Sequence, residues 1–556
     1  MRRVALCCAV LALALALAAC QRGAAPAPDT FDARAGADAR RIEADVRFLA
    51  DDLLEGREAA TRGHEVAALY VAQRLRAIGL APAGDDGGYF QRVPMLRATR
   101  LADGGQLRVT RNGASTALRY REQFLPELNY HGAEMAVTAP AVFVGQAVHA
   151  PALGHDDFRG IDVRGKVAVL FAGAPAALDS DRRAFHASSR EKLRELGARG
   201  AVGAVFVDTA GDEARTPWSR AMAAWDRPGM RLRAADGSGI DTFPQLRVVA
   251  HVSAAAADTL LGGDGRSAAQ LFRAADDGTL ASFALPGTIT LGARTAIAAV
   301  ESRNVVAKLA GSDAALARQH VLFSAHLDHL GIGAAVDGDT IYNGALDNAL
   351  GVAVLLEAAR ALAAMPVRPK RSLLFVAVTA EEKGLLGAQW YARHPTVPLR
   401  SIVANVNLDM PMLLTPTDDV VAVGLAHSSL QPLVRQAARD IGVALSPDPF
   451  PEQSVFVRSD QYAFIRAGIP AVYLMAGTDA SAFGDDANAA MQTFLRERYH
   501  QPGDDASQPI AYADAARLAR FNARIGQLIG DAPRRPQWNR GDFFGARFGG
   551  APVPTD

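Results

Sequence analysis

The sequence predicts an α/β fold: a mainly parallel mixed sheet flanked by helices, interrupted by an inserted β-rich module. After about residue 286, short apolar runs typical of buried strands alternate with helical patterns, which indicates a parallel sheet. Between residues 134 and 285, short β-rich runs are separated instead by Gly, Asp and Pro turns. The two patterns together predict one large α/β body and one smaller inserted module.

The composition is that of a folded protein without a global charge. The chain has 556 residues, of which 49% are hydrophobic and 21% charged, enough for two to four domains with cores of their own. Lys plus Arg equals Asp plus Glu at 59 each, so no basic field is available to hold nucleic acid. We therefore expect no nucleic-acid partner.

The N-terminus has the layout of an export signal. Arg2 and Arg3 precede an apolar run over residues 4–19, which is shorter than the roughly 20 residues that span a bilayer. The run ends in Leu-Ala-Ala-Cys, which resembles a bacterial lipobox in which Cys20 receives a lipid and becomes the mature N-terminus. Gln21 after the cysteine favours sorting to the outer membrane. The alternative is ordinary signal cleavage, which would give a soluble periplasmic protein.

All three cysteines, Cys7, Cys8 and Cys20, lie in this leader region. The body of the protein therefore has no thiol, which excludes disulfides and cysteine-ligated zinc there. We expect contact with the membrane through the lipid anchor only.

Periodicity along the body predicts its elements in order. Apolar residues at helical spacing predict two opening helices, over residues 42–53 and 68–78, and a later helix over 352–362. The tail from residue 532 is rich in Pro, Arg and Gly, which favours a surface extension. Strands of the main sheet are predicted at residues 305–309, 321–324, 373–378, 402–406 and 471–475.

Polar segments follow these strands, where ligands bind in open α/β sheets. Histidines and several carboxylates without cysteine suit borderline to hard divalent metals. Any one of the carboxylates is more often a helix cap or a turn residue, but together they point to a metal site. The neighbours Glu381 and Glu382 would repel unless a cation or a proton separated them, as when a metal ligand lies beside a general base. The segments are SAHLDH at 324–329, NGALDN at 343–348, TAEEKG at 379–384, NLDM at 407–410 and YHQP at 499–502.

The set HLDHLG, YNGALDN, AEEKGLLG, NLDMP and YHQP resembles the M28 family of zinc metallopeptidases over about residues 38–530. The early segments LEGR at 54–57 and YFQ at 89–91 are also similar to that family. The middle of the chain resembles a protease-associated domain, a module that serves here as a lid or spacer if it binds no ligand. Composition predicts a signal peptide at 1–19, a tether at 20–37 and an extension at 532–556. The resemblance implies the start of the peptidase domain at 38–133, the insertion at 134–285 and the rest of the peptidase domain at 286–531.

The resemblance also implies a ligand set. His326, Asp347 and Asp409 would hold one zinc, while Asp347, Glu382 and His500 would hold the other. Asp347 would bridge two Zn²⁺ per chain, each keeping an open position for a shared water.

Further roles come from the same resemblance. Glu381 would be the general base for that water. Asp328 would accept the second N–H of the His326 imidazole. The hydroxyl of Tyr499 would donate to the developing oxyanion, or its ring would simply pack beside His500. The peptide bond after Asp347 is expected to be cis.

Two departures from the family pattern bear on these assignments. An insertion over residues 331–342 contains Asp337 and Asp339, which compete with Asp347 for the bridging role; Asn-Gly before Asp347 and the helical run after it favour Asp347. Gln461 stands where the family has a histidine in its Ser-Asp-His motif. His329 and His427 are expected to be surface or packed residues.

The predicted function is hydrolysis of peptide bonds by an aminopeptidase that removes N-terminal residues from short peptides. One rival is a glutaminyl cyclase with a single zinc, against which the complete five-ligand set argues. The other is a non-catalytic, receptor-like protein on the same fold, against which Glu381 argues. Met410, Met412 and Leu413 follow a ligand and suit either a substrate pocket or the core. Side-chain preference and oligomeric state stay open.

Overall fold

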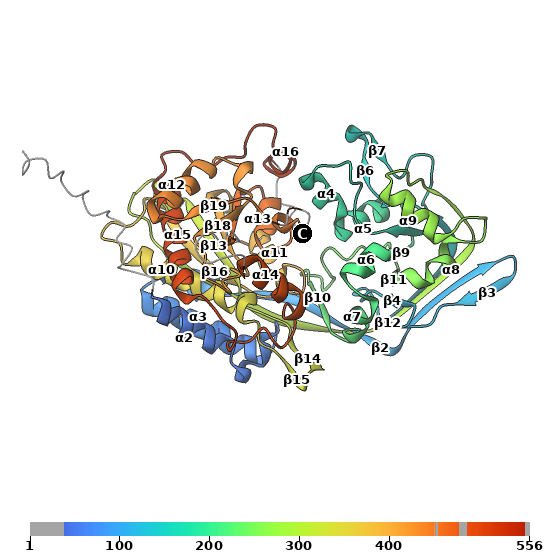
Figure 1. Cartoon of the computed structure of the whole chain (residues 1–556), viewed down its shortest axis with the longest axis horizontal. Helices are drawn as coiled ribbons and strands as arrows, with labels where there is room; N and C mark the ends of the chain where they lie inside the picture. Colours follow the sequence, from blue (N-terminus) through green and yellow to red (C-terminus); the bar gives the residue numbers. More distant parts are fainter. Residues whose placement is uncertain (1–37, 450, 452–453, 478–485, 551–556) are drawn as a thin grey trace, which may run out of the picture.

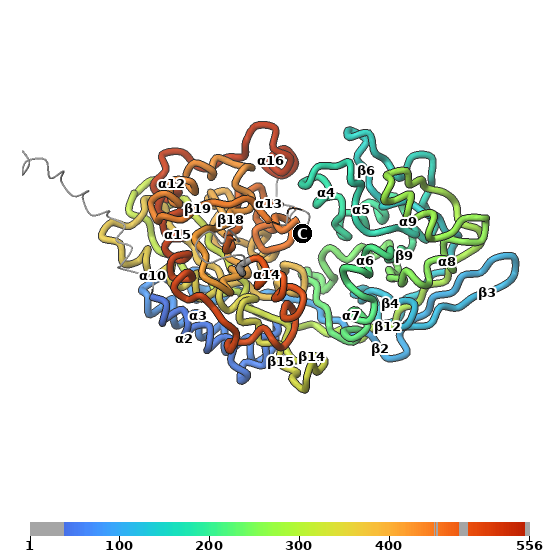
Figure 2. Tube along the Cα trace, viewed as in Figure 1, coloured from blue at the N-terminus to red at the C-terminus, as the bar shows by residue number. Residues whose placement is uncertain are grey.

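The computed structural model describes residues 38–449, 451, 454–477 and 486–550. These residues form two lobes side by side, with the first and last parts of the chain in one lobe and the middle in the other (Figures 1 and 2). The predicted signal, Cys20 and the tether lie outside the described residues. Within the described part of the chain, every helix is too short or too polar to cross a membrane.

The first lobe is built on the predicted sheet. Its strands β13 (His320–His326), β16 (Ser372–Val378), β17 (Ile402–Leu408) and β20 (Ala471–Ala476) run parallel to their neighbours in the order β20-β17-β13-β16. An antiparallel strand β18 (Asp419–Val423) continues the sheet beside β20 and pairs with β19 (Ala444–Ser446). The predicted strands are all present, and the mainly parallel mixed sheet is confirmed.

Two very long strands join the lobes. Strand β2 (Phe90–Arg111) pairs antiparallel with β12 (Phe283–Leu309), from Phe90 opposite Val305 to Thr110 opposite Thr288. The 27 residues of β12 follow a path of about 90 Å at the usual strand rise. One end of the pair therefore lies in the first lobe, next to β16, and the other in the second lobe, next to β5.

The second lobe contains strands and helices. Its sheet order is β5-β8-β9-β11-β4, and the six helices α4–α9 accompany these strands. Its hydrophobic core contains residues from Leu107 to Ala293, and some of them lie before or after the predicted insertion at 134–285. The bounds of that insertion therefore stay a prediction. The strands are β3 (Ala114–Ala117), β4 (Phe124–Pro126), β5 (Glu134–Phe143), β8 (Val167–Phe171), β9 (Gly203–Val207), β10 (Gly229–Leu232) and β11 (Val248–Val252); the helices are α4 (Ser180–Ala187), α5 (Ser189–Ala198), α6 (Ala210–Arg215), α7 (Trp218–Ala223), α8 (Ala257–Leu261) and α9 (Ala268–Asp276).

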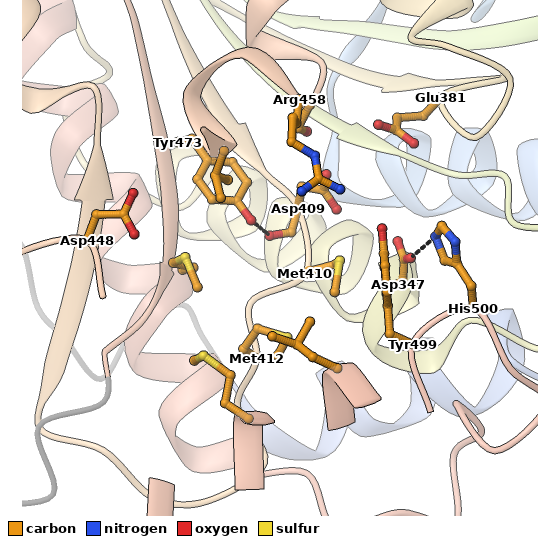
Figure 3. Close-up of a pocket in the computed structure, with 15 residues that line it drawn as sticks. Asp347, Glu381, Asp409, Met410, Met412, Asp448, Arg458, Tyr473, Tyr499 and His500 are labelled. Carbon is orange, nitrogen blue, oxygen red and sulfur yellow. Dashed lines mark hydrogen bonds and ion pairs between the residues drawn. The ribbon is translucent and has the colours of Figure 1, made fainter. Parts of the chain in front are cut away.

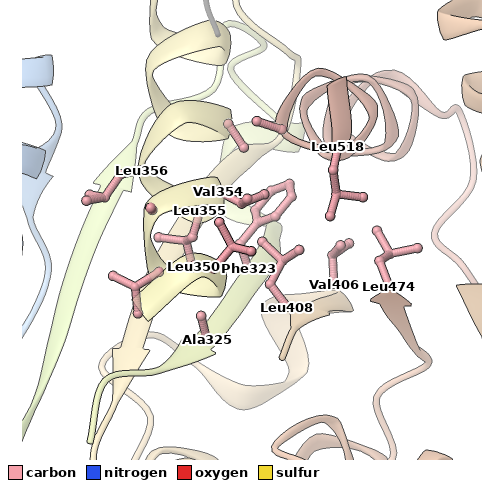
Figure 4. Packing of buried hydrophobic residues seen from close by; sticks show 14 of the residues in the cluster. Phe323, Ala325, Leu350, Val354, Leu355, Leu356, Val406, Leu408, Leu474 and Leu518 are labelled. Carbon is pink, nitrogen blue, oxygen red and sulfur yellow. The ribbon is translucent and has the colours of Figure 1, made fainter. Parts of the chain in front are cut away.

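Alternate side chains of the first-lobe strands enter two different cores, as the two-residue period of a strand requires. Phe323 and Phe375 stack with ring centroids 5.0 Å apart on the face covered by α10 (Leu350–Ala363) and α15 (Tyr512–Asp531) (Figure 4). Leu322 and its neighbours face the other way. The helix predicted over 352–362 is confirmed as part of α10. The opposite face is covered by α11 (Leu386–Arg393) and α13 (Gln461–Arg466), while α12 (Gln431–Ile441) and α14 (Asp486–Glu497) complete the lobe.

The opening segment and the tail differ from their predicted forms. The helix predicted over 42–53 ends earlier, as α2 (Ala39–Leu49), because the turn Asp52–Arg57 follows before α3 (Arg62–Ile78). The tail predicted as a surface extension instead packs on the first lobe. Its helix α16 (Phe543–Phe548) buries Phe544 completely, against the ring of Phe456. Aromatic residues supply this contact, although Pro, Arg and Gly dominate the composition of the tail.

His64 on α3 makes the stability of the fold depend on pH. The side chain is fully buried, and its Nδ1 lies 3.3 Å from Oγ of Ser302. Burial, together with the nearby Arg57 and Arg303, lowers the pKa of His64 from 6.5 to about 3. Between these two values the unfolded chain binds a proton and the folded chain does not. The free energy of unfolding therefore falls as the pH drops below 6.5.

We expect the wild type to lose about 2 kcal/mol more stability than His64→Asn when the pH is lowered from 7 to 5, since each pH unit below 6.5 costs about 1.4 kcal/mol. Urea unfolding at the two pH values measures both losses. Equal losses in the two proteins would show that the imidazole of His64 is not the group responsible.

Candidate metal centre

Three parallel strands bring candidate ligands to one edge of the sheet. His326 ends β13, Asp409 follows β17, and Glu382 follows β16. Nε2 of His326 lies 3.0 Å from Oδ1 of Asp409 and 3.1 Å from Oδ1 of Asp347. These groups are buried, so solvent screens their electrostatic interaction only weakly.

The same aspartate also faces a second histidine. Nε2 of His500 lies 3.2 Å from Oδ2 of Asp347 and 3.3 Å from Oε2 of Glu382 (Figure 3). The structure thus brings all five predicted ligands together, with one oxygen of Asp347 toward each imidazole. The competing Asp337 and Asp339 are exposed on the hairpin β14 (Gly331–Val336) and β15 (Asp339–Tyr342).

The residues present fit a divalent cation. Ligand atoms of His326, Asp347 and Glu382 lie within 4.8 Å of one another. Among the described residues, the buried Oε1 of Glu382 makes no hydrogen bond of good geometry, and the atom beside it is Nδ1 of His329 at 2.8 Å. Burial alone would lower the pKa of His500, but Glu382 and Asp347 outweigh it and raise that pKa to about 10. The field of the carboxylates therefore favours positive charge at this point, and nitrogen and oxygen donors without sulfur suit zinc.

Glu381 lines the cavity beside these groups and is set apart from its neighbour Glu382. Burial raises the pKa of the Glu381 carboxyl well above its ordinary value; His326 opposes this shift and Asp409 adds to it. A carboxylate in such surroundings accepts a proton more readily than one in water, which suits a general base.

Asp328 lies beside the second ring nitrogen of His326, but it contacts the imidazole through its main chain. Nδ1 of His326 donates to the backbone carbonyl of Asp328 at 3.1 Å, and not to the carboxylate. The carboxylate instead accepts the backbone N–H groups of Glu381, at 3.0 Å, and Glu382, at 3.4 Å. The backbone bends after His326, which brings the carbonyl within reach of the imidazole. Asp328 therefore fixes the histidine through its main chain and the glutamate pair through its side chain.

Two residues outside the predicted site support Asp347. The carboxylate of Asp504 accepts the N–H groups of Leu346 and Asp347 at 2.9 and 3.1 Å. Asn348 donates to the carbonyl of Leu408 and accepts the N–H of Met410, which ties the Asp347 loop to the end of β17. The bond between Asp347 and Asn348 is cis, as expected. The only sequence signal for Asp504 was an acidic residue close after His500.

His329 was predicted as a surface or packed residue, and it is packed against the site itself. The side chain is fully buried, and its Nδ1 lies 2.8 Å from Oε1 of Glu382. His427 packs elsewhere, stacked on Phe456 and 2.6 Å from a carboxylate oxygen of Asp542.

Gln461, the departure from the family pattern, is also buried. Its carbonyl oxygen accepts from Asn407 at 2.8 Å, and its amide donates to the carbonyls of Val455 and Phe456. Gln461 thus links strand β17 to the segment that walls the cavity.

Tyr499 stacks on His500 with ring centroids 3.8 Å apart, and its hydroxyl end points toward Asp347 (Figure 3). Burial raises the pKa of Tyr499, and the nearby Asp347 and Glu382 raise it further. The phenol therefore keeps its proton and can act as a hydrogen-bond donor.

Residues 304–525 match the family described as Peptidase family M28. The chain carries an M28 peptidase domain. The matched residues include all five candidate ligands and Glu381, and the predicted family is thereby confirmed.

The chain is similar to several known proteins, over most of its length in fold or over a short segment in sequence. An aminopeptidase from Aneurinibacillus sp. strain AM-1 has a similar fold, with a TM-score of 0.53 and 19% identity over 90% of this chain and 95% of that one. A zinc aminopeptidase from Bacillus subtilis gives a TM-score of 0.44 and 18% identity over 88% and 95% of the two chains. A probable zinc metalloprotease of Pyrenophora tritici-repentis is 46% identical over 67 residues, which are 12% of this chain. The chain spans only 15% of that curated relative.

A cavity of about 110 Å³ opens beside Asp347, Glu381 and Asp409 in the M28 domain (Figure 3). Away from these carboxylates, six apolar residues line it, four of them polarizable methionines, together with polar groups that include Asp448 and Arg458. The cavity is small and lies directly at the candidate ligands, so it has room for one side chain of a molecule bound there. The apolar lining residues are Met410, Met412, Met475, Met491, Leu495 and Val455.

Arg57, in the early LEGR segment, ties two ligand-bearing loops of the M28 domain together. Its guanidinium is almost fully buried and donates to the carbonyls of Leu327, Asn343 and Gly344 at 2.9, 2.6 and 3.0 Å, and to that of Leu49. Leu327 directly follows His326, and Gly344 lies three residues before Asp347.

The turn before Arg57 requires glycine at Gly56. Its φ is +67°, and a Cβ there would lie 2.3 Å from the carbonyl oxygen of Tyr342. Burial lowers the pKa of Arg57 to about 10, but the nearby Asp328 and Asp504 oppose this shift. Arg57 therefore stays charged and offsets part of the negative charge of the site.

We expect Arg57→Lys to lower zinc affinity about ten- to a hundredfold, because one ammonium cannot serve carbonyls on three loops and the ligands lose their alignment. Competition with a chromophoric chelator measures this affinity.

Arg371→Lys is the matched control, since Arg371 is also buried and donates to carbonyls, of Ile529 and Ala532, far from the ligands. It should lower the free energy of unfolding and leave zinc affinity intact. If both variants lost zinc equally, general destabilisation and not the loop contacts of Arg57 would be the cause.

Proposed function

We propose that this protein is a dinuclear zinc aminopeptidase that removes N-terminal residues from peptides. One observation carries the proposal: Asp347 presents one oxygen to His326 and the other to His500, as a carboxylate that bridges two cations must. His326, Asp347 and Asp409 would hold one zinc, and Asp347, Glu382 and His500 the other. The M28 domain and the aminopeptidase of similar fold support the reaction class.

Zinc, when bound, polarises the scissile carbonyl and lowers the pKa of the attacking water. Glu381 accepts the proton of that water and delivers it to the leaving amine, which contributes about a hundred- to ten-thousandfold. The carboxylate of Asp328 holds the backbone of Glu381 in place for both transfers. The hydroxyl of Tyr499 donates to the developing oxyanion.

The substrate's first side chain enters the methionine-lined cavity. The cavity lies directly beside Glu381 and Asp409, so a residue bound in it has its carbonyl at the ligands. Its six apolar lining residues favour apolar side chains, and Asp448 and Arg458 place charged groups in the same wall. Flexible methionines adapt to side chains of different shape.

The protein would act on the periplasmic side, exported by its signal and held at the outer membrane through a lipid on Cys20. This part of the proposal is supported by the apolar run over residues 4–19 and the lipobox-like motif that ends it.

We expect Glu381→Gln to keep two zinc ions per chain and to lose at least about a hundredfold in turnover, because the amide keeps the shape of the side chain and cannot accept the proton. Elemental analysis gives the metal count, and release of a chromogenic amine from amino-acid amides gives the turnover.

Glu497→Gln, on the exposed end of α14, is the matched control and should change neither quantity. Removal of zinc by a chelator should abolish amine release by the wild type, and added zinc should restore it. Activity that survives complete metal removal would overturn the proposed function, and ring closure of N-terminal glutamine without amide hydrolysis would favour a cyclase.

We expect Met475→Ala to enlarge the cavity and shift selectivity from leucine toward phenylalanine substrates by about tenfold in kcat/KM. Met475 is buried at the end of β20 and lines the cavity. Met230→Ala removes a buried methionine of another core and should leave the ratio unchanged. An unchanged ratio in Met475→Ala would mean that the substrate side chain binds elsewhere.

A further inference from the structure

Exposed apolar side chains gather on one side of the first lobe. Among the described residues, eight large hydrophobic side chains are exposed, and six of them lie on α2, the turn Asp52–Arg57, α3 and the hairpin β14–β15. Leu53 is 89% exposed, which is unusual for a leucine that packs on nothing of its own chain. We call these six residues the apolar face: Phe48, Leu53, Val66, Leu69, Ile332 and Val336.

The elements that carry the apolar face are in contact with one another. The ring of Phe48 on α2 stacks on that of Tyr70 on α3 at 3.9 Å, and Val66 lies one helical turn before Tyr70. The hairpin meets the turn at Gly56, which abuts the backbone of Gly331 and Tyr342. Figure 1 shows α2, α3, β14 and β15 along the same border of the lobe. Exposed apolar side chains gathered on neighbouring elements mark an interaction site.

The charges around this face do not select a strongly charged partner. Residues 38–79 and 331–342 together contain seven Lys or Arg and ten Asp or Glu, so the surroundings are weakly acidic. A surface that attracts through apolar side chains and carries little net charge suits the headgroup region of a phospholipid bilayer, into which such side chains insert.

The chain leads from this face to the proposed lipid anchor. Helix α2 begins at Ala39, and 17 residues, 21–37, separate Cys20 from Asp38. That number of residues spans at most about 60 Å, so an acylated Cys20 would keep the apolar face near the bilayer that holds it.

We infer that the apolar face lies against the phospholipid surface and inserts Leu53 and its neighbours at the headgroup boundary. The protein thus contacts the membrane through two sites, the lipid anchor and the apolar face of the first lobe. The inference rests on the proposed membrane location, and it is independent of the zinc chemistry.

The absence of thiols from the body gives a direct test. Since Cys7 and Cys8 leave with the predicted signal and Cys20 is acylated, a Leu53→Cys variant of the full chain carries a single free thiol. This thiol takes an environment-sensitive fluorophore, and the protein is reconstituted with phosphatidylethanolamine–phosphatidylglycerol vesicles that contain a lipid-borne quencher. We expect a blue shift and at least about twofold quenching, both unchanged in 0.5 M salt.

Val367→Cys is the matched control, because Val367 is 74% exposed and lies on the loop after α10, outside the apolar face. Its label should show neither effect. Flotation of the chain with the vesicles reports on the anchor separately. A chain that floats while the two labels behave alike would overturn the inference and leave the anchor standing.

Two other outcomes are informative. If the chain does not float but Leu53→Cys is quenched at high lipid concentration, the face binds lipid and the proposed anchor is wrong. A blue shift that needs no lipid and grows with protein concentration would assign the apolar face to a second copy of the chain and overturn the inference.

Discussion

The first lobe has to hold many carboxylates close together in a buried site with little access for solvent. Such groups repel one another, and burial removes the water that would otherwise stabilise their charge. The arrangement is stable only with compensating positive charge, which the imidazoles and Arg57 supply and to which a bound zinc ion would add. The same field that makes the centre attractive to zinc raises the pKa of His500 and, with burial, that of Glu381. The carboxylates concerned are Asp328, Asp347, Glu381, Glu382, Asp409, Asp460 and Asp504.

Backbone groups do much of the work of positioning this charge. Asp328 and Asp504 each accept two backbone N–H groups, and each pair of N–H groups belongs to a segment that carries a candidate ligand. Arg57 is a hydrogen-bond donor where the two aspartates are acceptors: it donates to carbonyls of the loops next to His326 and Asp347. The ligand-bearing loops are therefore held from both sides, and their geometry does not depend on the metal alone. This is the preorganisation that a catalytic centre requires.

The sequence alone was sufficient for the strands and for the segments that meet at their ends, because apolar runs and the polar residues after them leave a local pattern. It placed His326, Asp347, Glu382, Asp409 and His500 in five separate segments, and the structure brings these side chains together. It was not sufficient for Asp504, Asn348 or Arg57. Their partners are backbone groups of distant loops, and backbone groups have no residue identity that a motif can reveal. The prediction for the tail was wrong for a related reason. Its composition is typical of a surface segment, but the single buried side chain of Phe544 packs it on the first lobe.

The second lobe makes hydrogen bonds to the segments that carry two of the candidate ligands. Arg220 on α7 donates to the carbonyl of Tyr499 at 3.0 Å, directly before His500. Lys383, directly after Glu382, donates to the carbonyl of Pro228 at 3.3 Å. A lid or spacer that only shielded the cavity would need no contact with these two segments. Because the contacts reach the neighbours of two ligands, a rotation of the second lobe would have to break them or move the ligand loops with it. The position of the second lobe and the geometry of the metal centre are therefore coupled.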